Sequence, residues 1–168
     1  MGDIFKEHLV NRKRTVKDNI ITTLIIIAAL ILIILIAPFL GTFFVFGAAA
    51  IIYGAYWIIQ RQDIEFEYIL TNADLDIDKI INKSKRKKAL TVSVRDFEVM
   101  AHVEDNNHTH EFDGFEKTLD YSSGEAGENT YAALFNYNNQ KVKMIFEPNE
   151  AILKGIFYYI PRKLYIKK

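Results

Sequence analysis

The sequence predicts an α+β membrane protein, in which a two-helix transmembrane hairpin precedes an antiparallel β-barrel or split barrel with a C-terminal helix. Three observations carry this prediction. Residues 20–59 contain no Asp, Glu, Lys, Arg, His, Asn or Gln. From Asp63 onward apolar and polar residues alternate, which is the period of a half-buried strand. After Pro148 the apolar residues return at helical spacing.

The uncharged stretch is too long for a single membrane crossing. As one helix it would extend about 60 Å, twice the hydrocarbon thickness of about 30 Å. Pro38 and Gly41 stand near its middle, and this pair of residue types ends a helix and turns the chain. We therefore expect transmembrane helices at 20–37 and 42–59, joined by an extracytoplasmic turn at 38–41.

The first nineteen residues predict a cytoplasmic juxtamembrane segment that lies as a short amphipathic helix along the membrane interface. Basic residues flank both predicted spans, whereas the turn between the spans is uncharged. These flanking residues are Arg12, Lys13, Arg14, Lys17 and Arg61. Because positive charge stays on the cytoplasmic side, both termini are expected in the cytoplasm.

Small residues form a stripe on the second predicted span. Gly47, Ala50 and Gly54 follow each other at i, i+3 and i+7, a spacing that lets another helix approach closely. This candidate helix-packing face serves either the first span of the same chain or a second copy. Neither span contains an ionisable side chain of the kinds that form proton or ion relays, so no transport pathway is predicted.

Residues 63–168 predict one cytoplasmic domain of about seven antiparallel strands with a helix at its end. The strands are expected near 64–71, 74–81, 90–94, 97–101, 117–121, 130–137 and 141–146. Residues 104–117 predict an exposed acidic loop. Asn149 is the expected cap of the final helix. The apolar face of that helix consists of Ile152, Leu153, Ile156, Phe157 and Ile160.

Charge is segregated along the chain although the formal net charge is zero. Residues 101–140 carry eight acidic and one basic residue, and residues 141–168 carry seven basic and two acidic residues. The densest basic cluster consists of Lys83, Lys85, Arg86, Lys87 and Lys88. At about 1 kcal/mol for each basic residue near an anionic leaflet, this cluster is a candidate lipid-headgroup contact. The alternative is a solvated hairpin tip that prevents edge pairing.

Several functional classes lose their usual signatures. The chain has no cysteine, which excludes disulfides and thiolate chemistry. His102, His108 and His110 lie near carboxylates, but their polar segment favours a solvated loop over a metal site. Ser122 and Ser123 lack the spacing of a nucleophile elbow. We expect no catalytic residues, metal or cofactor, and no nucleic-acid binding, because basic residues and exposed aromatics do not interleave.

The run from Phe66 to Ile77 resembles the opening hairpin of bacterial pleckstrin-homology-like (PH-like) domains, in which a Tyr-x-Leu-Thr strand turns into Leu-x-Ile. Nearly the whole chain resembles a family of uncharacterised Gram-positive membrane proteins with two transmembrane helices. The motifs that carry this second resemblance are Asp-Tyr-Ser-Ser-Gly at 120–124 and Tyr-Ile-Pro-Arg-Lys at 159–163. The resemblance implies a PH-like domain, and it does not imply an enzyme.

The sequence-based hypothesis is a multi-pass protein of the bacterial cell membrane. Its cytoplasmic PH-like domain acts as a membrane-proximal binding or scaffolding module for a lipid headgroup or a protein partner. The alternative is a structural subunit, self-associated or part of a larger membrane complex, that assembles through the transmembrane hairpin.

Overall fold

The computed structural model describes residues 4–105 and 108–167. The chain forms two compact units. The helix unit comprises Arg14–Ile64 and Ile81–Lys85, and the sheet unit comprises Met1–Lys13, Glu65–Ile80 and Arg86–Lys168. Each unit therefore combines segments that are far apart in the sequence.

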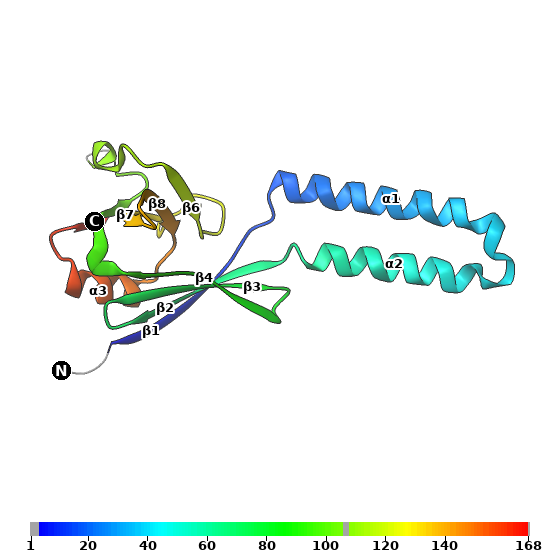
Figure 1. Cartoon of the computed structure of the whole chain (residues 1–168), viewed down its shortest axis with the longest axis horizontal. Helices are drawn as coiled ribbons and strands as arrows, with labels where there is room; N and C mark the ends of the chain where they lie inside the picture. The colour runs from blue at the N-terminus through cyan, green and yellow to red at the C-terminus, as the bar shows by residue number, and fades with distance from the viewer. Residues whose placement is uncertain (1–3, 106–107, 168) are drawn as a thin grey trace. The chain divides into compact units, whose positions relative to one another are not determined.

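The helix unit is built from one long apolar helical run, Val16–Gln60, which is long and apolar enough to cross a membrane. Within it, α1 (Val16–Leu40) is followed by a 3₁₀ turn, η1 (Gly41–Phe43), and by α2 (Phe44–Gln60). Figure 1 shows α1 and α2 side by side. Thr15 begins α1 with a capping box, because its hydroxyl accepts from the Asp18 amide while the Asp18 carboxylate accepts from the Thr15 amide.

The helix bounds differ from the predicted ones. Pro38 lies inside α1 and does not end it, and the helix continues to Leu40. Pro38 lacks an amide hydrogen and so removes one backbone hydrogen bond of α1, and the helix ends two residues later at Leu40. Gly41 ends the helix instead, because its φ of +47° lies in the left-handed region that suits glycine.

The first strand corrects the prediction for residues 1–19. β1 (Phe5–Asn11) is not an interfacial helix but pairs antiparallel with β2 (Ile64–Thr71), with Asn11 opposite Glu65. The side chains of His8 and Val10 share a face with the buried residues of β2. The helical run is thus inserted between two neighbouring strands of one sheet.

The described residues of the sheet unit form two sheets and the helix α3, with short 3₁₀ helices between strands. The first sheet has the order β1-β2-β3-β4, with β3 at Asp74–Ile81 and β4 at Lys85–Ser93. The second has the order β6-β8-β7-β5-β9. Its strands are β5 (Phe97–His102), β6 (Lys117–Asp120), β7 (Tyr131–Tyr137), β8 (Gln140–Phe146) and β9 (Leu164–Tyr165). β6–β8 and β5–β9 are parallel pairs, so the expected all-antiparallel pairing is wrong at these two places.

The core lies between the sheets and α3 (Glu150–Tyr159). Short 3₁₀ helices, η2 (Val94–Asp96) and η3 (Thr109–Phe112), connect the strands. Asn149 caps α3 as predicted, accepting from the Ile152 amide at 2.9 Å. Gly155 lets α3 approach the first sheet, because a Cβ there would lie 2.5 Å from Leu70 Cδ2. The largest fully buried side chains are Tyr68, Leu70, Leu75, Ile77, Phe97, Met100, Leu134, Phe135, Met144, Phe146, Ile152 and Ile156.

Candidate functional site

The helix unit gathers basic residues at the ends of its two helices. We call these residues, Arg14, Lys17, Arg61, Lys83 and Lys85, the basic collar. The same unit contains only two acidic residues, Asp18 and Asp63. With five basic and two acidic residues, its net formal charge is +3. A positive collar at the end of an apolar helix pair suits an anionic membrane surface.

Polar bonds tie the start of α1 to the end of α2. Arg14 Nη2 lies 2.9 Å from Asp63 Oδ1, and Thr22 Oγ1 donates to Gln62 Oε1 at 3.1 Å. The Arg14–Asp63 pair is nearly half exposed, so its contribution to stability is small, of the order of 0.5 kcal/mol. Together, the ion pair and the hydrogen bond hold the N-terminal end of α1 next to the C-terminal end of α2.

A tight turn between β3 and β4 brings Lys83 and Lys85 to the C-terminal end of α2. Asn82 and Lys83 adopt positive φ angles of 49° and 50°, which turns the chain sharply between β3 and β4. The Asn82 amide donates to the Asp63 carbonyl at 2.8 Å, and Asn82 Nδ2 donates to Gln60 Oε1 at 3.3 Å. The turn is therefore bonded directly to the end of α2.

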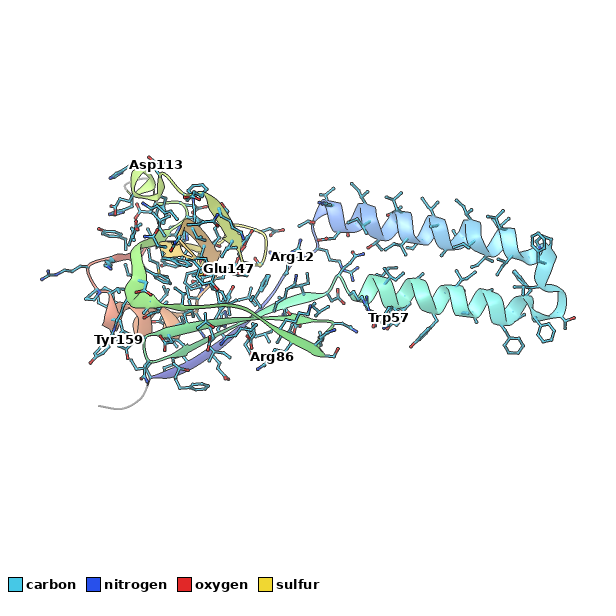
Figure 2. The ribbon with its side chains drawn as sticks, viewed as in Figure 1. Arg12, Trp57, Arg86, Asp113, Glu147 and Tyr159 are labelled. Atoms are coloured by element: carbon cyan, nitrogen blue, oxygen red, sulfur yellow. The ribbon has the colours of Figure 1, made fainter. Side chains whose placement is uncertain are left out.

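Aromatic side chains adjoin the collar on α2. Arg61 stacks over the ring of Trp57, with Cζ 3.6 Å from the ring centroid. Tyr53 and Tyr56 are exposed, and the Tyr56 hydroxyl accepts from Gln60 Nε2. Trp57, labelled in Figure 2, lies in the last turns of α2. Tyrosine and tryptophan next to basic residues are the composition of a membrane–water interface.

The chain was compared with known protein families, curated proteins and solved structures. The sequence signature of the bacterial PH-like domain family DUF6106 matches residues 2–166. The chain belongs to this family. The matched residues span the helical run Val16–Gln60. No curated protein and no solved structure matches the chain.

The basic cluster predicted from the sequence is divided between the two compact units. Lys83 and Lys85 belong to the helix unit, whereas Arg86, Lys87 and Lys88 belong to the sheet unit. In the sheet unit, Arg86, labelled in Figure 2, pairs with Glu67 on β2 at 2.5 Å. The five residues are therefore divided between the two units, and their role as a lipid contact stays a prediction.

Lys88 forms a second ion pair within this sheet. Its Nζ lies 2.9 Å from Asp76 Oδ1, and Thr91 donates to the same oxygen. Burial acts to raise the pKa of Asp76, but the hydrogen bonds from Thr91 and Lys88 outweigh it, so that the pKa is lowered overall. The charges of Arg86 and Lys88 are thus matched by carboxylates of β2 and β3.

The predicted acidic loop is more ordered than expected. Phe112 of η3 is buried in a cluster with Val99, Ala101, Ala132 and Leu134. Glu104 accepts from Lys167 at 2.9 Å, and this hydrogen bond lowers the pKa of Glu104. Residues 106–107 of the loop lie outside the described residues. The acidic segment is therefore anchored to the second sheet and to the end of the chain.

The three histidines weighed as metal ligands have different surroundings. His102 is buried, and its Nε2 donates to the carbonyls of Gly127 and Glu128 while its Nδ1 accepts from the Glu104 amide. His108 bonds to Asp105 at 2.8 Å, and His110 is exposed. Among residues 4–105 and 108–167, no group of three potential metal ligands is close enough to hold an ion.

The paired serines belong to a hydrogen-bond network that the sequence did not reveal. Glu147, labelled in Figure 2, accepts at Oε1 from the Ser123 amide, the Ser123 hydroxyl and the Thr130 hydroxyl. Ser122 Oγ donates to Asp120 at 2.7 Å. These hydroxyls fix the segment between β6 and β7, which agrees with the predicted turn.

The small-residue stripe on α2 has two different environments. A Cβ at Gly47 would lie 2.5 Å from Leu40 Cδ1, so Gly47 allows close packing against α1 of the same chain. A Cβ at Gly54 would meet nothing within 4 Å, and Ala50 is exposed. The stripe therefore serves the chain's own helix pair at one end and is open at the other.

Proposed function

We propose that the protein is anchored by a two-helix transmembrane hairpin and that its PH-like domain is a cytoplasmic binding module at an anionic membrane surface. The observation that carries the proposal is the pairing of β1 with β2, which precede and follow the helical run. Paired strands lie on the same side of a membrane. The run between them must then return to the side where it began, which supports an even number of crossings.

Helix length supports two crossings. At about 1.5 Å per residue, the 25 residues of α1 extend about 38 Å and the 17 residues of α2 about 26 Å. Both lengths suit a hydrocarbon core of about 30 Å, the longer helix with some tilt. The collar is basic and η1 is uncharged, so the positive-inside rule places the collar and both termini in the cytoplasm.

Cysteine labelling tests this topology, because the natural chain contains no cysteine. We expect Thr42→Cys, in η1, to react with a membrane-impermeant maleimide in intact cells. Ser84→Cys, in the turn beside the collar, should react only after the membrane is permeabilised. Labelling of Ser84→Cys in intact cells, or protection of both positions until permeabilisation, would contradict the topology.

The collar is proposed to recognise anionic lipid headgroups. Its net charge of +3 corresponds to about 3 kcal/mol of attraction to an anionic leaflet, at about 1 kcal/mol per charge. Trp57 is the chain's single tryptophan and stacks under Arg61, so its fluorescence reports on lipids at the collar. Brominated phosphatidylglycerol should quench Trp57 more strongly than brominated phosphatidylcholine in mixed vesicles.

A matched pair of variants completes this test. The double substitution Lys83→Glu and Lys85→Glu should remove the preference for phosphatidylglycerol. Lys117→Glu and Arg162→Glu changes the total charge equally at exposed positions outside the collar, and should preserve the preference. Equal quenching of the wild-type protein by the two lipids would refute headgroup recognition while leaving the topology untouched.

The second candidate function is assembly of a larger membrane complex through the hairpin. The open face at Gly54 favours it, since a neighbouring helix could approach there without displacing an internal contact. Crosslinking in native membranes should give a discrete oligomer that Gly54→Leu abolishes. A wild-type protein that crosslinks to no discrete species would eliminate this candidate.

A further inference from the structure

Among the described residues, β1 is an edge strand of the first sheet, and α3 packs against it. In the first sheet it pairs with β2, and no other described strand pairs with it. Phe5 and Leu9 are 57% and 44% exposed on the outer face of this strand. An edge strand offers unpaired amide and carbonyl groups to another extended chain.

The register shows which backbone groups are available. The Asn72 amide donates to the Ile4 carbonyl at 2.7 Å, so this pair is a hydrogen-bonded one. In an antiparallel ladder, hydrogen-bonded pairs alternate with non-hydrogen-bonded pairs. The even-numbered residues of β1 therefore bond to β2. Phe5, Glu7 and Leu9 direct their amide and carbonyl groups away from β2, toward the free edge.

A cavity of about 420 Å³ lies beside this edge. Its lining residues are Ile4, Lys6, Glu150, Ala151, Lys154, Gly155 and Tyr158. The lining comes from the β1 segment and α3 and includes no residue of β2, which places the cavity beside the outermost strand. A chain added beside β1 would lie about 4.8 Å away and would direct every second side chain over this cavity.

Within the described residues, one positive charge in the cavity lining has no ion-pair partner. Lys154 Nζ bonds to Glu150 Oε1 at 2.6 Å, which neutralises that pair. Lys6 forms no ion pair within the part of the chain that the structure describes. An acidic side chain on the incoming segment would complement it.

We propose that β1 and this cavity bind an extended peptide segment of another protein, which adds a strand to the first sheet. Backbone groups of Phe5, Glu7 and Leu9 hold the segment. An apolar side chain of the segment fills the cavity against Ala151 and Tyr158, and an acidic side chain pairs with Lys6. The site lies in the sheet unit and does not depend on lipid binding by the collar.

The experiment uses the full-length protein in detergent micelles and the fluorescein-labelled peptide Thr-Glu-Thr-Leu-Thr-Val-Thr, whose Glu, Leu and Val share one face. Glu7→Pro removes an outward amide but keeps the ladder to β2, because proline is tolerated on the open side of an edge strand. Fluorescence anisotropy should show that Glu7→Pro weakens binding about tenfold or more, whereas Glu7→Ala binds like the wild type. Lys6→Glu should reverse the preference toward a probe with Lys in place of Glu.

Amide hydrogen exchange supplies a second measurement that also checks folding. Bound peptide should slow exchange at Glu7 and Leu9 and leave Lys6 and His8 unchanged, since their amides already bond to β2. Unchanged protection of Lys6 and His8 in Glu7→Pro would show that the strand remains formed. The proposal is overturned if the probe shows no saturable binding up to about 1 mM, the weak end of specific affinity, or if Glu7→Pro and Glu7→Ala bind it equally.

Discussion

Replacing Tyr68 with phenylalanine tests how the two sheets are held together. The Tyr68 side chain is fully buried, and its hydroxyl donates to the Tyr121 carbonyl at 2.6 Å and accepts from the Glu147 amide at 3.2 Å. Tyr68 lies on β2, whereas its partners follow β6 and β8 of the other sheet. Tyr68→Phe keeps the ring and removes both bonds.

The cost follows from the two groups left behind. An unsatisfied, buried backbone group costs about 1–3 kcal/mol, and both partners are only partly buried, so the lower end applies to each. We therefore expect Tyr68→Phe to lower the free energy of unfolding by about 2 kcal/mol. For a unit of about 100 residues this lowers the Tm by roughly 10 °C.

Thermal and urea unfolding of the full-length protein in detergent, followed by circular dichroism, measures this change. Tyr121→Phe is the matched control, because the Tyr121 hydroxyl has no hydrogen bond within the described residues. The control should stay within about 0.5 kcal/mol of the wild type. If Tyr68→Phe were as stable as Tyr121→Phe, the hydroxyl would not contribute to joining the sheets.

Three further outcomes are expected. In the free protein, the Glu7 amide should exchange much faster than the Lys6 amide, because only the latter bonds to β2. Gly155→Val should lower stability by about 1–3 kcal/mol in urea unfolding, because its Cβ would lie 2.5 Å from Leu70 Cδ2. Burial lowers the pKa of His8 below 6.5, so stability should fall as the pH drops below 6.5 and then level off beneath the folded-state pKa.

Each of these outcomes has its own control. Equal exchange of the two β1 amides would show that the register is wrong. Gly127→Ala, whose Cβ would meet its nearest atom at 3.9 Å, should be tolerated; equal losses for Gly127→Ala and Gly155→Val would discount the close approach of α3. His8→Asn should flatten the stability profile between pH 5 and pH 7, roughly the range in which an unperturbed histidine titrates, and an unchanged slope would exclude His8 as its source.

Local patterns were sufficient for several elements. The strands β2 and β3 follow from strict alternation, and α3 follows from the Asn149 cap and its apolar spacing. The family resemblance carried by Phe66–Ile77 is confirmed at the level of a bacterial PH-like domain. In these segments the local preference and the tertiary environment favour the same conformation.

The candidate site was predicted only in part. Lys83 and Lys85 were selected as basic turn residues, but the turn that carries them is bonded to the end of α2 by Asn82, whose partners lie about twenty residues away. Arg86 and Lys88 have the same local character as their neighbours, yet Arg86 pairs with Glu67 on β2, two strands away, and Lys88 pairs with Asp76 on the adjacent strand β3. Charge counts along a chain do not report such cross-strand pairs.

The sequence by itself determined a long uncharged helical run with a break near its middle, a set of alternating strands and a closing helix, because each of these is encoded by neighbouring residues. Only the tertiary structure decided that Phe5–Asn11 is a strand. Its apolar spacing also suits an interfacial helix, and its partner β2 lies beyond the whole helical run. That one long-range pairing makes β1 a strand of the first sheet, so the helical run is an insertion in the sequence between two neighbouring strands. Hydrogen bonds between distant strands outweigh a weak local preference.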